Sequence, residues 1–272
     1  MLSLTGFRSQ TDGLKNSSTK MPALFIGHGN PMNAIEDNSF SNAWKKTAEQ
    51  LPKPTAILCI SAHWQTKGTF VTAMEKPRTI HDFGGFPKEL FDKQYPARGA
   101  VALAKETAKL VHHTQVGLDE EWGLDHGTWS VLAQMYPLAD VPVYQLSLDY
   151  TQPPAWHYSL ARELSVLRNK GVLIVGSGNI VHNLELVNWN GGAYDWAVEF
   201  DQTAMRLINN HDHEALIHYD RLGEAARLSI PTNEHYLPLL YTLALQDKTE
   251  LHSFFAEETV MGSVSMRSLK IG

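Results

Sequence analysis

The sequence over residues 172–182 reads VLIVGSGNIVH: four apolar residues, a break at glycine and serine, and then a histidine. Short apolar runs bounded by such breaks are typical of strands buried inside a sheet. Two other segments share the pattern, ALFIGHGNP at residues 23–31 and TAILCISAHW at residues 55–64. We therefore predict buried strands over residues 23–26, 55–60 and 172–175.

Helical segments alternate with these strands. Residues 38–51 place Phe40, Trp44, Ala48 and Leu51 on one face, a helical spacing that ends at two prolines. Further helices are predicted over residues 99–111, 155–169, 194–209 and 235–245. A strand is predicted over 141–148, a weaker strand over 68–73, strand character over 254–269, and a loop over 77–99. The alternation predicts an α/β fold: a single domain over residues 21–272, with a central mostly parallel or mixed sheet and helices on both faces.

Composition limits the classes of function. The chain has 272 residues, 43% of them hydrophobic and 19% charged, with a net charge of −6 and no run of basic residues. This argues against a nucleic acid or an anionic membrane as the main partner. The polar residues 1–20 lack the apolar core of a secretory signal, so we expect a flexible N-terminal extension and a cytoplasmic protein. The single cysteine, Cys59, lies in an apolar run and is expected to be buried.

Histidines follow the three buried strands. They are His28, His63 and His182, and each stands just past a strand end with a small residue nearby. Ligands bind at the carboxyl ends of strands in open α/β sheets, so these side chains are expected to converge. A fourth, His235, begins a predicted helix beside Glu234. Imidazole is a common ligand of transition metals, and the four histidines therefore predict one divalent metal site.

Two more histidines are candidates for the same site. His126 lies in EEWGLDHGTWS, and a histidine beside acids suits a general acid or base near neutral pH. His81, in TIHDFGGFP, is a candidate for lining a substrate pocket. Five further histidines stand in polar or helical stretches and are expected at the surface: His112, His113, His211, His213 and His218.

Six motifs together resemble a known family. They are LFIGHGNPMNA, ISAHW, TIHDFGGFP, LDHGTW, GSGNIVHN and PTNEHYLPLLY, in this order from residue 24 onward. The set resembles the class III extradiol ring-cleavage dioxygenases, most closely the 4,5-DOPA dioxygenase extradiol branch, over about residues 21–272. The resemblance implies a catechol and O2 as substrates and Fe(II) for activity. It also implies that His28, His63, His182 and His235 bind the metal and that His126 is catalytic.

Some alternatives remain open from the residues alone. Iron oxygenases commonly use two histidines and one carboxylate, so Glu234 competes with His235 as a ligand. Zn(II) is expected in the purified protein because nitrogen sites bind it more tightly than Fe(II). A zinc hydrolase and a non-catalytic metal-binding protein are the other functions to consider. Arg78, Lys88 and Arg98 are candidates for binding a substrate carboxylate or, alternatively, solvated surface charges; the oligomeric state is open.

Overall fold

The computed structural model describes residues 20–272. The predicted extension over residues 1–20 therefore lies outside the described residues except for Lys20. Within the described part no helix is long and apolar enough to cross a membrane.

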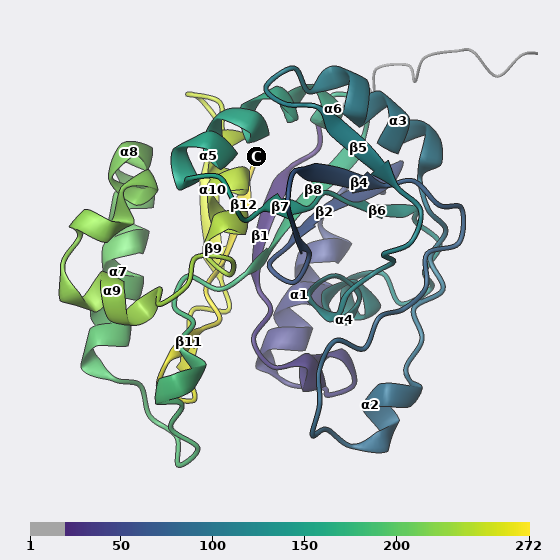
Figure 1. Cartoon of the computed structure of the whole chain (residues 1–272). Helices are drawn as coiled ribbons and strands as arrows, with labels where there is room; N and C mark the ends of the chain where they lie inside the picture. Colours follow the sequence, from purple (N-terminus) through teal and green to yellow (C-terminus); the bar gives the residue numbers. More distant parts are fainter. Residues whose placement is uncertain (1–19) are drawn as a thin grey trace, which may run out of the picture.

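A six-stranded mixed sheet forms the centre of the molecule (Figure 1). Its strand order is β6-β2-β8-β1-β12-β9, in which the first four strands are parallel and the last two run antiparallel to their neighbours. The bounds are β1 Ala23–Gly27, β2 Ala56–Ser61, β6 Val143–Gln145, β8 Val172–Gly178, β9 His252–Phe255 and β12 Ser268–Ile271. The three strands predicted from the apolar runs are thus adjacent, with β8 between β1 and β2.

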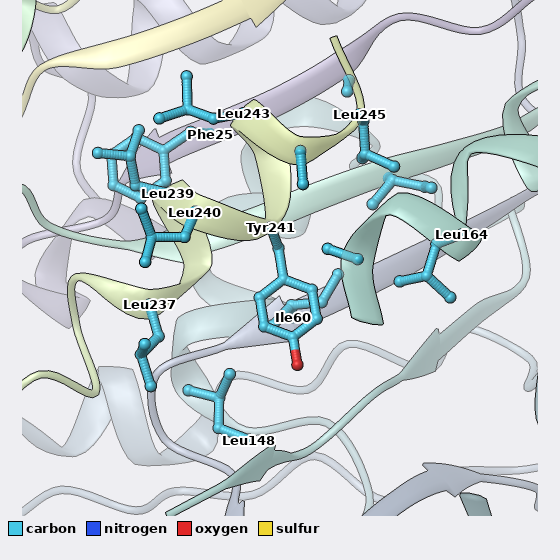
Figure 2. Close-up of a cluster of buried hydrophobic side chains, with 14 of the residues drawn as sticks. Phe25, Ile60, Leu148, Leu164, Leu237, Leu239, Leu240, Tyr241, Leu243 and Leu245 are labelled. Atoms are coloured by element: carbon cyan, nitrogen blue, oxygen red, sulfur yellow. The ribbon is translucent and has the colours of Figure 1, made fainter. Parts of the chain in front are cut away.

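Helices cover both faces of the sheet. Side chains along a strand alternate between the two faces, so each buried strand contributes apolar residues to the core on either side. Phe25, Ile60 and Ile174 belong to the core that includes α5 (Pro154–Glu163) and α10 (Leu237–Ala244). Figure 2 shows part of this cluster, with Phe25, Ile60 and Leu164 around the leucines and Tyr241 of α10.

The alternate residues of the same strands point to the other face of the sheet and pack there. Ile26, Cys59 and Val175 form a second core with α1 (Ser39–Glu49) and α4 (His126–Met135). Cys59 is 1% exposed, as expected for a small buried hydrophobe. The predicted single-domain α/β fold with helices on both faces is confirmed.

The remaining elements connect or flank this core. The helices are η1 Pro31–Ala34, α2 Lys88–Asp92, α3 Val101–Leu110, α6 Ser165–Arg168, η2 Leu184–Leu186, α7 Asp195–Asn209, α8 His213–Ile217, η3 Tyr219–Arg221 and α9 Glu224–Ser229. The strands are β3 Gln65–Thr66, β4 Thr69–Thr72, β5 Val116–Asp119, β7 Leu148–Asp149, β10 Thr259–Val260 and β11 Val264–Ser265. Figure 1 shows α7, α8 and α9 as a group beside the sheet.

Several predicted boundaries were wrong. The strand predicted over 141–148 is two strands, because β6 ends at Gln145 and β7 pairs with β3 outside the main sheet. The strand character over 254–269 divides among β9 to β12, and the last predicted helix begins at Leu237 rather than at residue 235. The helix predicted over 155–169 divides at Leu164 into α5 and α6. The predicted loop over 77–99 contains the short helix α2.

The histidines predicted at the surface divide into two groups. His112, His113 and His211 are exposed, as predicted. His213 and His218 are half-buried, and Nδ1 of His213 lies 2.8 Å from the Tyr158 hydroxyl. The surface prediction was therefore wrong for His213, because the polar sequence around it does not show that it packs against Tyr158 of α5.

His157 is a buried histidine of α5. It has no exposed surface, and its Nδ1 lies 3.0 Å from the Tyr241 hydroxyl across the α5–α10 interface. Burial lowers the pKa of His157 to about 4, against the opposing effect of Asp149. In the unfolded chain a histidine has a pKa of about 6.5.

We expect this difference to destabilise the protein in acid. Below about pH 6.5 the unfolded chain binds a proton that folded His157 does not, so stability falls as the pH drops toward 4, by up to about 3 kcal/mol. In urea unfolding of metal-free protein at pH 7.5 and 5, the loss of unfolding free energy should be about 2 kcal/mol smaller for His157→Gln than for the unmodified chain. Equal losses in the two proteins would contradict the prediction.

Candidate active site

The carboxyl ends of β1, β2 and β8 meet at one edge of the sheet and deliver the first site residues. His28 follows β1 directly, and its backbone N–H donates to the carbonyl of Gly178 at the end of β8. One residue, Ala62, separates His63 from the end of β2. At Gly178 a Cβ atom would overlap the carbonyl oxygen of His235, so only glycine lets the segment carrying His235 approach this strand end.

The His28 and His63 rings face each other through their Nε2 atoms, which are 3.2 Å apart. The Ser177 hydroxyl donates its proton to the carbonyl of Gly127 at 2.5 Å. The Ser177 oxygen, 3.0 Å from Nδ1 of His28, must therefore accept a hydrogen bond from that nitrogen. This fixes the proton of neutral His28 on Nδ1 and leaves a lone pair on Nε2, directed toward His63.

His63 and His235 show the same arrangement at their Nδ1 atoms. Oδ2 of Asp82 lies 3.5 Å from Nδ1 of His63, and Oε1 of Glu234 lies 3.0 Å from Nδ1 of His235. Metal-binding histidines usually donate their second ring N–H to an oxygen of this kind, which orients the ring and fixes the tautomer. His28 and His235 are thus held in the form in which Nε2 is free to bind a metal ion, and the Asp82 carboxylate beside Nδ1 of His63 favours the same form there.

The imidazoles are neutral at physiological pH. Burial, reinforced by the charges of neighbouring imidazoles, lowers the pKa of His28 and His235 well below the usual value. Burial together with the charge of His126 lowers the pKa of His63 to about 3, against the opposing effect of Asp82. Burial likewise lowers the pKa of His182 to about 4. Neutral imidazoles are metal ligands, so the cluster fits a cation.

The spacing of the nitrogens also fits an ion. Metal–nitrogen bonds of about 2.0–2.1 Å at tetrahedral angles place two ligand nitrogens about 3.3 Å apart. The 3.2 Å between the Nε2 atoms of His28 and His63 agrees with this spacing. The His235 ring lies nearby, with its centroid 5.3 Å from that of His28 and 5.0 Å from that of His63.

His182 lies differently from the other predicted ligands. Its ring stacks on His235, with centroids 3.5 Å apart and an angle of 9° between the planes. The lone pair of an imidazole nitrogen lies in the ring plane, so an ion bound by one stacked ring lies well outside the plane of the other. The two rings do not direct their lone pairs at one common point in this arrangement, although one ligand atom each of His182, Glu234 and His235 lie within 4.8 Å of one another.

His126 begins α4 and reaches the same site from the other side. Its ring centroid is 3.9 Å from that of His63, and its Nδ1 is 3.0 Å from Oδ1 of Asp82. The same carboxylate oxygen accepts the backbone N–H of His126 at 2.9 Å. Burial raises the pKa of Asp82, but the contacts with His126 and the charge of His63 outweigh it, and the pKa lies below its ordinary value. Asp82 is therefore an anion that accepts the backbone N–H of His126 and lies beside its ring.

A buried polar network anchors the start of α4. The Asp125 carboxylate caps this helix by accepting from the backbone N–H of Thr128, and it also accepts from Ser61 and Gln145, each at 2.6 Å. The network joins the ends of β2 and β6 to the residue before His126. Burial and the charge of Asp82 raise the pKa of Asp125.

Asp82, Asp125 and Gln145 were not predicted from the sequence as site residues. Asp82 lies in the segment predicted to be a loop. Its neighbour His81 was predicted to line the substrate pocket instead. Nε2 of His81 lies 2.9 Å from the carbonyl of Lys93 and its ring packs near Phe83. Proximity of an acid to two sequence-distant histidines is the signal that identifies Asp82, and it exists only in the folded chain.

A cavity of about 340 Å³ opens at this edge of the sheet. This volume lies in the range of small-molecule sites. Five histidines and Asp82 line it together with mostly apolar residues, whereas His81 is not among the lining residues. The histidines are His28, His63, His126, His182 and His235.

The three basic residues considered for a substrate carboxylate lie outside this lining. Arg78 donates through Nε to the carbonyl of Trp122, and Lys88 pairs with Asp92 on the surface of α2. Arg98 is exposed. None of the three lines the cavity in the described part of the chain.

A cluster of histidines with an acid beside it, at the strand ends of an α/β sheet, is typical of an active site that holds a metal ion. Comparison with known proteins gives the class of protein. Residues 21–266 match the family described as "Catalytic LigB subunit of aromatic ring-opening dioxygenase". The chain belongs to this family and is an extradiol aromatic ring-opening dioxygenase. The resemblance found in the sequence motifs is confirmed.

Individual relatives agree with this assignment. The chain is 49% identical over 271 residues to a 4,5-DOPA dioxygenase extradiol of Escherichia coli (strain K12), covering 94% of this chain and 96% of the relative. A protein of the same name from Portulaca grandiflora is 36% identical over 226 residues, with 80% and 83% coverage. A crystal structure of an uncharacterized protein from Escherichia coli K12 superposes with a TM-score of 0.80 at 44% identity, covering 93% of this chain and all of that one.

Proposed function

We propose that this chain opens the ring of a catechol with O2, using one divalent ion held by Nε2 of His28, His63 and His235. A single observation carries the proposal: each of these rings has an oxygen at its Nδ1, which leaves Nε2 as the ligand atom. Bound there, the ion would supply a positive charge for the catecholate and a route for electrons to O2, which favours Fe(II) as the working metal. Zn(II) has no redox chemistry, so a zinc-loaded protein is expected to be inactive.

Glu234 serves this site better as a partner of His235 than as a ligand. Its Oε1 is 3.0 Å from Nδ1 of His235 and also accepts from the Thr232 hydroxyl at 3.0 Å. Both contacts hold the carboxylate against the outer side of the imidazole. A carboxylate in this position orients the ring and makes Nε2 a stronger donor.

His182, predicted as a ligand both from its position after a strand and from the resemblance, is proposed here as a neighbour of the ion. Stacking on His235 directs its lone pairs along a parallel plane 3.5 Å away. His235 has the oriented Nδ1 and lies close to His28 and His63, so we assign the ligand position to His235. His182 still lines the cavity, where it contacts what binds there.

His126 is proposed as the catalytic base. Asp82 occupies its Nδ1 side, so Nε2 is the atom that takes a proton from a catechol hydroxyl and returns it later. Loss of that proton lets the catechol oxygen bind as an anion. Asp82 holds the ring in this tautomer and stabilises the imidazolium that forms.

The experiment that tests the function is oxygen uptake by the Fe(II)-reconstituted chain with L-DOPA, chosen because the relatives bear that name. We expect one O2 consumed per substrate and a yellow ring-opened product. Zinc-loaded protein is the control and should consume none. If Fe(II)-loaded protein leaves L-DOPA, caffeate and unsubstituted catechol all unchanged, the proposal is wrong, and hydrolysis by the zinc form becomes the reaction to examine.

A further inference from the structure

Ser177 lies near the end of β8, between a proposed metal ligand and the turn that carries the proposed base. Its hydroxyl oxygen is 3.0 Å from Nδ1 of His28 and 2.5 Å from the carbonyl oxygen of Gly127, the residue after His126. Ser177 has no exposed surface, so bulk water does not compete for either contact. One buried hydroxyl therefore joins the two parts of the site.

The hydrogen bonds through Ser177 run in one direction. The Gly127 carbonyl can only accept, so the serine proton belongs to that contact and the N–H at Nδ1 of His28 donates to the serine oxygen. Hydrogen bonds linked in such a chain polarise and strengthen one another. When Nε2 of His28 binds a cation, its Nδ1–H becomes a stronger donor, and both bonds of the chain should tighten.

The turn at Gly127 packs directly on the strand ends. A Cβ atom there would lie 2.5 Å from the Ser61 hydroxyl oxygen and 2.9 Å from Cδ2 of His63, so only glycine permits this approach. The Ser61 hydroxyl donates to Asp125 at 2.6 Å, and its oxygen accepts the backbone N–H of His63 at 3.2 Å. Ser61 thus holds the residue before the base, and Ser177 holds the residue after it.

We propose that Ser177 is a positioning residue that couples the metal site to the base: it holds His28 in the tautomer whose Nε2 binds the ion, and it fixes His126 relative to that ion. The proposal rests on the proposed function, since it needs His28 as a ligand and His126 as the base. Without the serine oxygen, the proton of neutral His28 can move to Nε2, which lies 3.2 Å from Nε2 of His63. An Nε2 that carries a proton does not bind the ion, and the turn after His126 loses its link to β8.

The first test is the tautomer of His28 in metal-free protein, measured from the ¹⁵N chemical shifts of its ring nitrogens. The signals are assigned by their loss in His28→Gln. We expect the Nδ1–H form in the unmodified chain and a shift of about tenfold in the tautomer ratio toward Nε2–H in Ser177→Ala. Ser229→Ala is the matched control, because it removes another fully buried serine hydroxyl, one without a hydrogen-bond partner among the described residues.

The second test measures the metal and the reaction separately in the same variants. In competition with a chelator, Ser177→Ala should bind Zn(II) about 10- to 100-fold more weakly than the unmodified chain. At saturating Fe(II) and catechol its kcat should still be about tenfold lower, because the base is no longer fixed relative to the ion. Ser177→Cys has a similar volume but a weaker donor and acceptor, so its values should lie between those of serine and alanine.

Three outcomes would overturn the inference. The first is a tautomer ratio and Zn(II) affinity in Ser177→Ala equal to those of Ser229→Ala. The second is full recovery in Ser177→Cys, which would mean that the side chain only fills space. The third is weaker Zn(II) binding with an unchanged kcat, which would remove the coupling to the base. Failure of the proposed function is distinguishable from all three, because the unmodified Fe(II)-loaded chain would then open no catechol, or His28→Gln would keep full Zn(II) affinity.

Discussion

His235→Ala is expected to lower Fe(II) affinity by more than about 100-fold and to abolish ring opening, whereas Glu234→Gln should weaken binding only about 10- to 100-fold. The difference follows from their positions. Removing His235 removes a ligand, but Glu234→Gln leaves Nε2 of His235 in place and changes only the group 3.0 Å from its Nδ1. Metal content after dialysis against a competing chelator measures both effects without relying on activity.

His182→Ala provides the comparison within the same pair of stacked rings. If His235 is the ligand of this stacked pair and His182 is not, His182→Ala should lose less than about tenfold in metal affinity. Stacking of His182 on His235 helps to orient that ring but does not itself bind the ion. Greater loss in Glu234→Gln than in His235→Ala would transfer the ligand position to the carboxylate. Metal loss in His182→Ala equal to that in His235→Ala would restore the four-histidine site implied by the sequence resemblance.

The meeting of His28 and His63 could be predicted from sequence because it depends on local patterns. An apolar run followed by a break identifies a strand and its end, and parallel strands bring their carboxyl ends to one edge. The direction of the last strands could not be predicted in this way. An apolar run near residue 268 is the same whether the strand is parallel or antiparallel, and only pairing with β1 decides.

The acidic residues of the site could not be predicted from local sequence patterns either, because their roles depend on contacts between distant segments. Asp82 is 44 residues from His126, and nothing in TIHDFGGFP distinguishes it from a solvated loop acid. The Asp125–Gln145 contact likewise depends on where β6 ends. The choice of His81 in the same loop followed residue type alone, and in the structure its Nε2 is occupied by the carbonyl of Lys93.

His126→Ala is expected to reduce kcat by about 10²- to 10⁴-fold while the protein keeps its metal. Nδ1 of His126 lies 3.0 Å from Oδ1 of Asp82, and we therefore expect Nε2 to exchange the proton with the catechol. Asp82→Asn should reduce kcat by a smaller factor, because the base remains but loses the anion that orients it and stabilises its protonated form. Single-turnover rates with Fe(II)-loaded protein and saturating catechol, together with metal content, measure both.

His81→Ala is the matched control, because this histidine is next to Asp82 in the chain but does not line the cavity. It should retain a rate within about threefold of the unmodified enzyme, whereas a general base is worth far more. Metal content distinguishes the two roles open to His126, since one of its ring nitrogens lies within 4.8 Å of ligand atoms of His28 and His63. Loss of metal in His126→Ala would make it a ligand, and a slow, metal-loaded variant would make it the base. A variant with both metal and full rate would leave proton transfer to His182, the remaining imidazole in the cavity outside the proposed ligand set.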